Sequence, residues 1–245
     1  MCKRSKLILG FCLIVLLLQF SSAMAQPAKV EKSGSGGGYF MMGVSVLDVD
    51  DLNTRLANSG YPEFSNNFIS IGGGGRGFVN KFVLGGQGHT LIAGDENITL
   101  NNTAYKTSLT AGYGLFNFGY LIYSKNRLNI YPLIGLGGGG LMLKITEDSS
   151  PSFDEILANP KRSVELNFGV FLLSVSLGME YFIKLGEDEK GIGGLIVGLE
   201  AGYMIAPFSD DWMMEKNDVI GGPDIGFQGP YIRFMFGGGG MSKQR

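Results

Sequence analysis

Residues 128–144 read LNIYPLIGLGGGGLMLK, and this stretch decides the fold. Large apolar side chains occupy one alternating set of positions, Leu128, Ile130, Pro132, Ile134 and Leu136. Smaller or more polar groups occupy the other set, Asn129, Tyr131, Leu133, Gly135 and Gly137. A strict period of two predicts a strand with two different faces. In a soluble sandwich the apolar face would be core, whereas in a transmembrane barrel it would meet lipid and the other face would line a narrow lumen.

The start of the chain favours the second of these folds. Basic residues precede an apolar run at 7–20, and the sequence Ala-Met-Ala follows at 23–25. This order is typical of a cleavable secretory signal peptide, here 1–25, which would leave Gln26 as the first mature residue. The alternative is an N-terminal membrane anchor, but the apolar run is shorter than the ~20 residues that a spanning helix needs.

Cysteine content and charge exclude several function classes. Both cysteines, Cys2 and Cys12, lie in the predicted signal peptide, so the mature chain would have no disulfide, thiol catalysis or cysteine-bound metal. Acidic residues outnumber basic ones, 22 to 20, which argues against a broad attraction to nucleic acid. An exported, cysteine-free and alternating chain with 40 glycines is typical of a bacterial outer-membrane barrel. A periplasmic sandwich, the alternative, should carry more charge on its exposed strand faces.

Alternation predicts eight strands, at 39–49, 67–79, 82–93, 105–123, 128–145, 164–185, 195–205 and 228–236. Their connections alternate in length. The long ones are 49–66, 94–102, 146–163 and 207–223, and the short ones are 80–81, 124–127 and 186–191. Long extracellular loops opposite short periplasmic turns are typical of a barrel, and nothing in a sandwich would sort its loops this way.

In three of these strands the apolar pattern changes phase part way along. The change falls within Gly137–Gly140, between Leu172 and Leu173, and near Leu115. A slip of one residue turns every later side chain over, so we expect the faces to exchange through β-bulges at these points. The same strands are longer than the ~9–11 residues that cross a bilayer, so we expect them to extend beyond the membrane.

Over roughly 37–236 the chain resembles the small eight-stranded outer-membrane barrels of the OmpA, OmpX and OmpW type. The resemblance rests on the signal peptide, the strand number, the sorted loops and the aromatic-ended last strand at 231–236, YIRFMF. It implies an all-β, eight-stranded, antiparallel, up-and-down transmembrane barrel that is inserted in the outer membrane by the barrel-assembly machinery. Such barrels commonly end on an aromatic residue, whereas here 237–245 follow Phe236.

The predicted organisation therefore has four parts. A signal peptide, 1–25, precedes a flexible Gly/Ser-rich lead, 26–37. The barrel itself is expected at 38–237, and a polar tail at 238–245.

Strand parity assigns a set of polar residues to the lumen, Arg76, Gln87, His89, Lys106, Asn129, Tyr131, Glu180, Glu200 and Arg233. An eight-stranded barrel has room for side chains and little else, and buried charges must pair. Glu200 and Arg233 fall on neighbouring strands and form the predicted pair, which Glu180 could join, while Arg76 needs a partner too. We expect a plug that holds the barrel together. The alternative is a gated ion path built from the charged members and His89.

Three classes of function remain open. The first is a structural or interaction barrel that displays loops 49–66, 146–163 and 207–223 to an extracellular partner. The second is a narrow channel for small apolar or polar solutes. The third is a lipid-modifying enzyme, since outer-membrane lipases and acyltransferases of this size use a histidine with a serine or threonine and a carboxylate. His89 is the single histidine, but the adjacent Thr90 faces away from it, so we predict no enzyme.

Cofactor and metal motifs are weak. The glycine runs 72–75 and 137–140 lack the Lys-Ser/Thr ending of a phosphate loop. Asp48, Asp50 and Asp51 are not followed by a calcium-binding loop. We therefore predict no cofactor, no metal and no nucleic acid, with outer-membrane lipids as the first partner.

Overall fold

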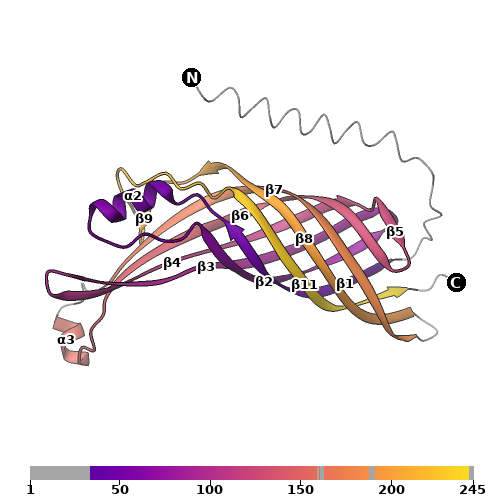
Figure 1. Ribbon diagram of the computed structural model, residues 1–245, viewed down its shortest axis with the longest axis horizontal. Coiled ribbons are helices and arrows are strands. Elements are labelled where there is room, and N and C mark those ends of the chain that lie inside the picture. The colour runs from indigo at the N-terminus through magenta and orange to yellow at the C-terminus, as the bar shows by residue number, and fades with distance from the viewer. Residues whose placement is uncertain (1–33, 159, 161–162, 188–190, 243–245) are drawn as a thin grey trace, which may run out of the picture. The chain divides into compact units, whose positions relative to one another are not determined.

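The computed structural model describes residues 34–158, 160, 163–187 and 191–242. The predicted signal peptide lies outside these residues. Eight antiparallel strands form a closed ring (Figure 1): β1 Ser35–Val46, β2 Asn67–Val79, β3 Phe82–Leu100, β4 Thr103–Tyr120, β6 Leu128–Glu147, β7 Ser163–Glu187, β8 Gly191–Ser209 and β11 Gly229–Ser242. Each strand pairs with its neighbour in the chain, and β1 pairs with β11 to close the ring. The predicted up-and-down barrel is confirmed.

The remaining elements are short and lie in the connections. They are strands β5 Tyr123–Lys125, β9 Met213–Met214 and β10 Asn217–Asp218, and helices α2 Asp50–Asn58 and α3 Phe153–Ala158. Helix α2 begins at Asp50, its N-cap is Val49, and no side chain caps it. Gly60, with a φ of 81°, follows its end. None of the helices in the described ranges is long and apolar enough to cross a membrane.

The strands are longer than predicted at several ends. Gly36 and Gly37, assigned to a flexible lead, pair with Gly240 and Gly239, assigned to a polar tail, between β1 and β11. Both assignments are wrong over these residues, because a ladder of backbone hydrogen bonds needs no side chains. The predicted loop 94–102 is likewise absorbed into β3 and β4, which meet in a two-residue turn at Asn101 and Asn102 with φ of 50° and 63°.

The three predicted exchanges of faces are wrong. Along β6 the odd-numbered residues face inward throughout, from Tyr131 to Leu141 and Leu143, and pairing with β4 and β7 runs without a bulge. The inward set stays odd-numbered in β4 and even-numbered in β7, although β7 does show a register shift against β8 between Phe171 and Leu173. The strands do not turn over. Instead, the barrel interior changes from polar to apolar along its axis.

The apolar part of the interior lies at the long-loop end and is closed by two of the loops. We call it the apolar plug. Strand residues contribute Leu91, Leu109, Leu141, Leu143, Phe168 and Leu172, loop 49–66 contributes Leu52, Leu56 and Phe64, and the segment before β11 contributes Trp212, Ile225 and Phe227. The Asn53 side chain fixes the first loop by bonding both the N–H and the C=O of Phe64 at 2.8 Å. Loops 49–66 and 207–223 are therefore folded over the mouth of the barrel.

Inside the barrel, large side chains lie opposite glycines on the paired strand. The pairs include Tyr39 with Gly237, Gln87 with Gly74, His89 with Gly72, Tyr131 with Gly178, Tyr231 with Gly202 and Arg233 with Gly43. A narrow lumen can hold such side chains only because their neighbours have none. The glycine content therefore follows from the crowding of the interior.

Gly137→Ala should destabilise the barrel by about 1–3 kcal/mol, the usual cost of overpacking. Its Cβ would overlap the backbone oxygen of Gly114 and lie 3.0 Å from Leu115 Cα, and backbone cannot move aside easily. Gly114→Ala is the matched control, because its Cβ would point outward with nothing nearer than the Gln87 oxygen at 3.9 Å. Urea unfolding in vesicles should show a loss for Gly137→Ala alone; equal losses would mean that glycine is needed for backbone freedom instead.

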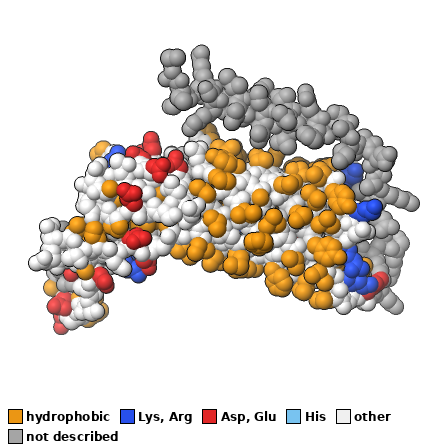
Figure 2. Space-filling view, in the orientation of Figure 1, with side chains coloured by type: hydrophobic (Ala, Val, Ile, Leu, Met, Phe, Trp, Pro, Cys, Tyr) orange, Lys and Arg blue, Asp and Glu red, His pale blue; other side chains and the backbone are white. Residues whose placement is uncertain are grey.

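The outer face of the barrel carries a belt of apolar side chains (Figure 2). Its members include Phe40, Ile69, Phe116, Ile134 and Phe234, which are between 51% and 65% exposed. These are residues whose parity predicts an outward direction. Beyond the belt, the parts of β3, β4, β6 and β7 nearest the long loops continue as a sheet that leads to α3 (Figure 1). We call this part the protruding sheet.

Candidate functional site in the lumen

Five strands bring the charged residues together below the apolar plug. The structure places all five candidate residues inside the barrel, with exposed fractions of 6% or less: Arg76, His89, Glu180, Glu200 and Arg233. Each lies at an inward position of its strand, as parity predicts. What parity cannot give is which of them meet across the lumen, because strands that are not neighbours face one another there.

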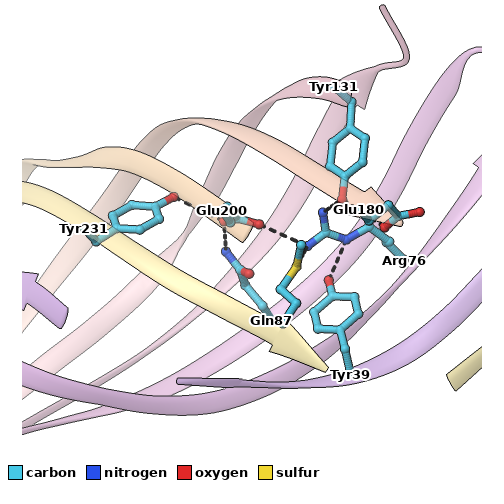
Figure 3. Close-up of polar contacts among 8 residues, drawn as sticks. Tyr39, Arg76, Gln87, Tyr131, Glu180, Glu200 and Tyr231 are labelled. Atoms are coloured by element: carbon cyan, nitrogen blue, oxygen red, sulfur yellow. Dashed lines mark hydrogen bonds and ion pairs between the residues drawn. The ribbon is translucent and has the colours of Figure 1, made fainter. Parts of the chain in front are cut away.

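Arg76 is the centre of the polar network (Figure 3). Its Nη2 donates to Glu200 Oε2 at 3.0 Å, and its Nε donates to the Tyr39 hydroxyl at 2.8 Å. Its Nη1 donates to the Tyr131 hydroxyl, and its guanidinium lies over the rings of both tyrosines. A charge-assisted bond between fully desolvated groups of opposite sign is stronger than a neutral one, so this contact ties β2 to β8 across the lumen.

The carboxylates of Glu200 and Glu180 accept hydrogen bonds from different sets of side chains. Glu200 also accepts from Gln87 Nε2 at 3.1 Å and from the Tyr231 hydroxyl at 3.4 Å. Glu180 accepts from Asn129 Nδ2 at 3.2 Å and from the Tyr131 hydroxyl at 3.0 Å. Tyr131 thus links Glu180 to Arg76, so one guanidinium serves both carboxylates.

The predicted Glu200–Arg233 ion pair is wrong. The two residues are direct partners in the β8–β11 register, but the Glu200 carboxylate is bonded to Arg76 instead. Arg233 stacks on the Tyr231 ring, 3.7 Å from its centroid, and donates to Ser45 Oγ at 3.4 Å. Its Nε and Nη1 have no hydrogen-bond partner among the described residues. An aromatic face therefore holds the second guanidinium in place of a carboxylate.

His89 has a neighbour that parity along its own strand does not reveal. Ser70 on β2 places its Oγ 3.2 Å from His89 Nδ1, and the imidazole stacks on Tyr113 with ring centroids 5.2 Å apart. Both members of this pair are buried, and His89 Nε2 has no hydrogen-bond partner in the described ranges. In a catalytic serine–histidine pair the histidine is oriented by a third group. Among the described residues no such group bonds His89 Nε2, and Ser70 and His89 form a buried hydrogen-bonded pair.

Of two other residues predicted to face the lumen, Asn129 does so and Lys106 does not. Asn129 lies in the network beside Glu180, although it is only partly buried. The assignment of Lys106 to the lumen is wrong: it lies outside, on the protruding sheet, because β4 keeps its parity and even-numbered residues there face outward. A hydrogen bond from Lys106 to Asp95, 2.7 Å long, raises the pKa of the Lys106 ammonium above its ordinary value.

The network also includes phenols and hydroxyls that charge-based reasoning misses. Tyr39, Ser45, Ser70, Tyr113 and Tyr231 all complete contacts of a charged residue or of His89. In the sequence, only their alternating position along the strand indicates that these residues face the lumen. Chemically, the described lumen is an interlocked set of two guanidiniums, two carboxylates and their neutral donors. It joins strands that share no ladder.

No cation site emerges on the outside either. No group of three or more His, Cys, Asp or Glu side chains in the described ranges could hold a metal ion. Asp50 accepts from Asn66 at 2.9 Å, and Asp51 accepts from the Asp224 N–H at 2.9 Å. Asp50 therefore connects the two ends of loop 49–66, and Asp51 connects this loop to the segment that follows loop 207–223.

Comparisons with known proteins give only weak likenesses among solved structures, of which two are described below. No protein-family model matches the chain, and no curated protein does. Ail, the attachment invasion locus protein of Yersinia pestis, aligns over 87% of this chain and 100% of its own, at 10% identity and a TM-score of 0.40. The outer membrane protease OmpT from Escherichia coli aligns over 91% and 100%, at 9% identity and a TM-score of 0.33. The assignment of a barrel depends on the strand pairing of this chain itself.

Proposed function

We propose that this chain is an outer-membrane β-barrel whose interior is closed and structural, and whose activity is the display of a surface at the long-loop end. The observation that carries this proposal is the double closure of the lumen. The Arg76 network occupies its polar part, and the apolar plug with its two folded loops closes the long-loop end.

The membrane location is supported by the outer face. Large apolar side chains there are about half exposed, and a soluble protein rarely exposes so continuous an apolar belt. Charged side chains lie at the two ends of the barrel instead (Figure 2). This distribution is the one that lipid requires.

The surface available for a partner is narrower than three displayed loops. Loops 49–66 and 207–223 are packed over the plug, so the protruding sheet and α3 remain. Pairing between β2 and β3 ends at Ile69 and Ile92, and beyond a bulge Gly94–Leu100 pair with β4 alone. An unpaired strand edge can accept an added strand of another chain. On α3, Phe153 and Leu157 are 74% and 66% exposed.

Limited proteolysis of intact cells tests this proposal. A glutamate-specific protease should cut at Glu155 on α3 well before Glu63, which is also exposed but lies beside the clamped Phe64. Urea-unfolded protein serves as the control and should be cut at both. Equal rates in the folded protein would show that loop 49–66 is displayed after all.

Conductance across planar bilayers tests the closed lumen. The wild-type barrel should give no steady ion current, because the Arg76 network crosses the lumen and the apolar plug closes its long-loop end. A stable open level would favour the narrow channel over the surface role.

A further inference from the structure

Acidic and basic side chains lie mainly at opposite ends of the barrel. Among the described residues, acidic side chains far outnumber basic ones at the long-loop end, whereas the short-turn end is basic (Figure 2). At the short-turn end, the one exposed acidic side chain of the described residues is Glu187, and Lys184 bonds to it. The other cationic side chains that the described residues place at that end are Lys81, which is half-buried, and Lys125 and Arg127, which are exposed.

These three residues form one basic patch on two adjoining turns. Lys81 lies in the β2–β3 turn, and its backbone oxygen accepts from Leu121 N–H at 2.7 Å, just before β5. Lys125 and Arg127 flank Asn126 in the β5–β6 turn, and the Arg127 oxygen accepts from Phe182 N–H at 2.9 Å. One of these bonds fixes the Lys81 turn to the segment that leads into β5, and the other fixes the Arg127 turn to β7.

Aromatic side chains lie next to the basic patch on the outer face. Phe82, Tyr120, Tyr123 and Tyr181 are between 42% and 48% exposed, and Lys81 Nζ lies 5.9 Å from the centre of the Tyr120 ring. Tyrosine side chains favour the boundary between hydrocarbon and headgroups, and basic residues beside them extend their charges to the phosphates. The basic patch thus sits where lipid headgroups would be.

Arg127 occupies a backbone position that favours another residue. Its φ is 68° and that of Asn126 is 53°, the left-handed pair of a type I′ turn. Asparagine suits the first position, but glycine is strongly preferred at the second, and an arginine there carries strain. The backbone conformation alone would favour glycine in place of Arg127.

We propose that Lys81, Lys125 and Arg127 bind the phosphate groups of anionic phospholipids in the leaflet that surrounds the short turns. This inference rests on the proposed membrane location. Each basic side chain close to an anionic membrane surface strengthens the association about fivefold. A guanidinium also donates two parallel bonds to a phosphate, which favours Arg127 as the principal contact.

Urea unfolding of the full chain in two kinds of vesicle tests the proposal. Trp212, the single tryptophan and buried in the apolar plug, reports unfolding by fluorescence. We expect the wild type to be more stable in phosphatidylcholine mixed with phosphatidylglycerol than in phosphatidylcholine alone. The triple variant Lys81→Gln, Lys125→Gln, Arg127→Gly should lose most of this difference, about fivefold in the unfolding constant for each charge. Higher salt should weaken the wild-type difference, since exposed charges are screened.

The single variant Arg127→Gly separates lipid binding from folding. It should equal or exceed the wild type in phosphatidylcholine, because its backbone strain is relieved, and fall behind it when phosphatidylglycerol is present. Lys106→Gln with Lys144→Gln, at the acidic end, is the matched control and should leave the lipid difference unchanged.

Three outcomes would contradict one proposal or the other. A triple variant with the wild-type lipid difference would overturn the headgroup site. Equal stabilisation by free inorganic phosphate in detergent would overturn its assignment to lipid. Failure of the wild type to insert into either vesicle would instead overturn the proposed membrane location.

Discussion

Arg76→Met should lower the free energy of unfolding by about 3–5 kcal/mol, the largest effect expected from a single change in the lumen. The substitution leaves Glu200, which is fully buried, without its ion partner, and it removes the Arg76–Tyr131 bond through which the guanidinium is linked to Glu180. A buried carboxylate without a counter-charge is costly, whereas the methionine itself can pack against Met235, which already contacts the Arg76 side chain. Urea unfolding in phosphatidylcholine vesicles measures the loss.

A double-mutant cycle identifies the cause. Glu200→Gln combined with Arg76→Met should recover much of the loss, because no orphan charge remains. Arg233→Met with Glu200→Gln is the matched comparison, since Arg233 is the register partner of Glu200 but does not bond to its carboxylate. Its coupling energy should be clearly smaller. The reverse order of the two couplings would show that Glu200 pairs with Arg233.

Trp212→Ala should cost about 3–5 kcal/mol, the range for a large buried aromatic. The indole is 3% exposed, packs on Phe168 with ring centroids 5.4 Å apart, and donates from Nε1 to the Pro223 oxygen at 2.8 Å. The change would remove a central part of the apolar plug and release loop 207–223. Thermal unfolding and the rate of proteolysis at Glu215 should both report it.

Phe153→Ala is the control for that experiment. Phe153 is also a large aromatic on a long loop, but it is 74% exposed on α3. Its removal should change stability by less than about 0.5 kcal/mol. Similar losses for the two variants would mean that loop 207–223 is no more buried than loop 146–163.

Most of the architecture was readable from periodicity. The ring of eight strands, three of the four long connections, and the outward direction of Phe40, Ile134 and Phe234 all follow from a period of two. The limits of β1 and β11 did not follow, since glycine runs carry no period. Their pairing depends on a strand from the other end of the chain.

The predicted exchange of faces shows why hydrophobicity alone misleads. Leu141 and Leu143 are apolar and lie inside, whereas Ile134 and Leu136 are apolar and lie outside. The rule that apolar groups face lipid holds only beside the polar part of the lumen. Where the interior becomes apolar, the sequence pattern reverses although the strand does not.

The sequence predicts which charged residues face the lumen, but it does not predict which of them bond to each other. Parity placed Arg76, Glu180, Glu200 and Arg233 inside. It then favoured partners on neighbouring strands, so it paired Glu200 with Arg233. The observed contact crosses from β2 to β8, and only the curvature of a closed ring brings those strands face to face. Ser70 was missed beside His89 because a serine at an inward position carries no charge to mark it.

The glycine pairing between β1 and β11 has a consequence for how the ring is assembled. These strands are the most distant in the chain, so joining them requires closing its longest loop, and such contacts form late. Along Gly36–Gly38 and Gly238–Gly240 the two strands cohere by backbone bonds alone. We therefore expect the pairing along this stretch to be the last to form when the barrel closes and the first to open when the barrel unfolds. An assembly factor that pairs with the free edge of β1 or β11 would have to dissociate before these two strands pair with each other.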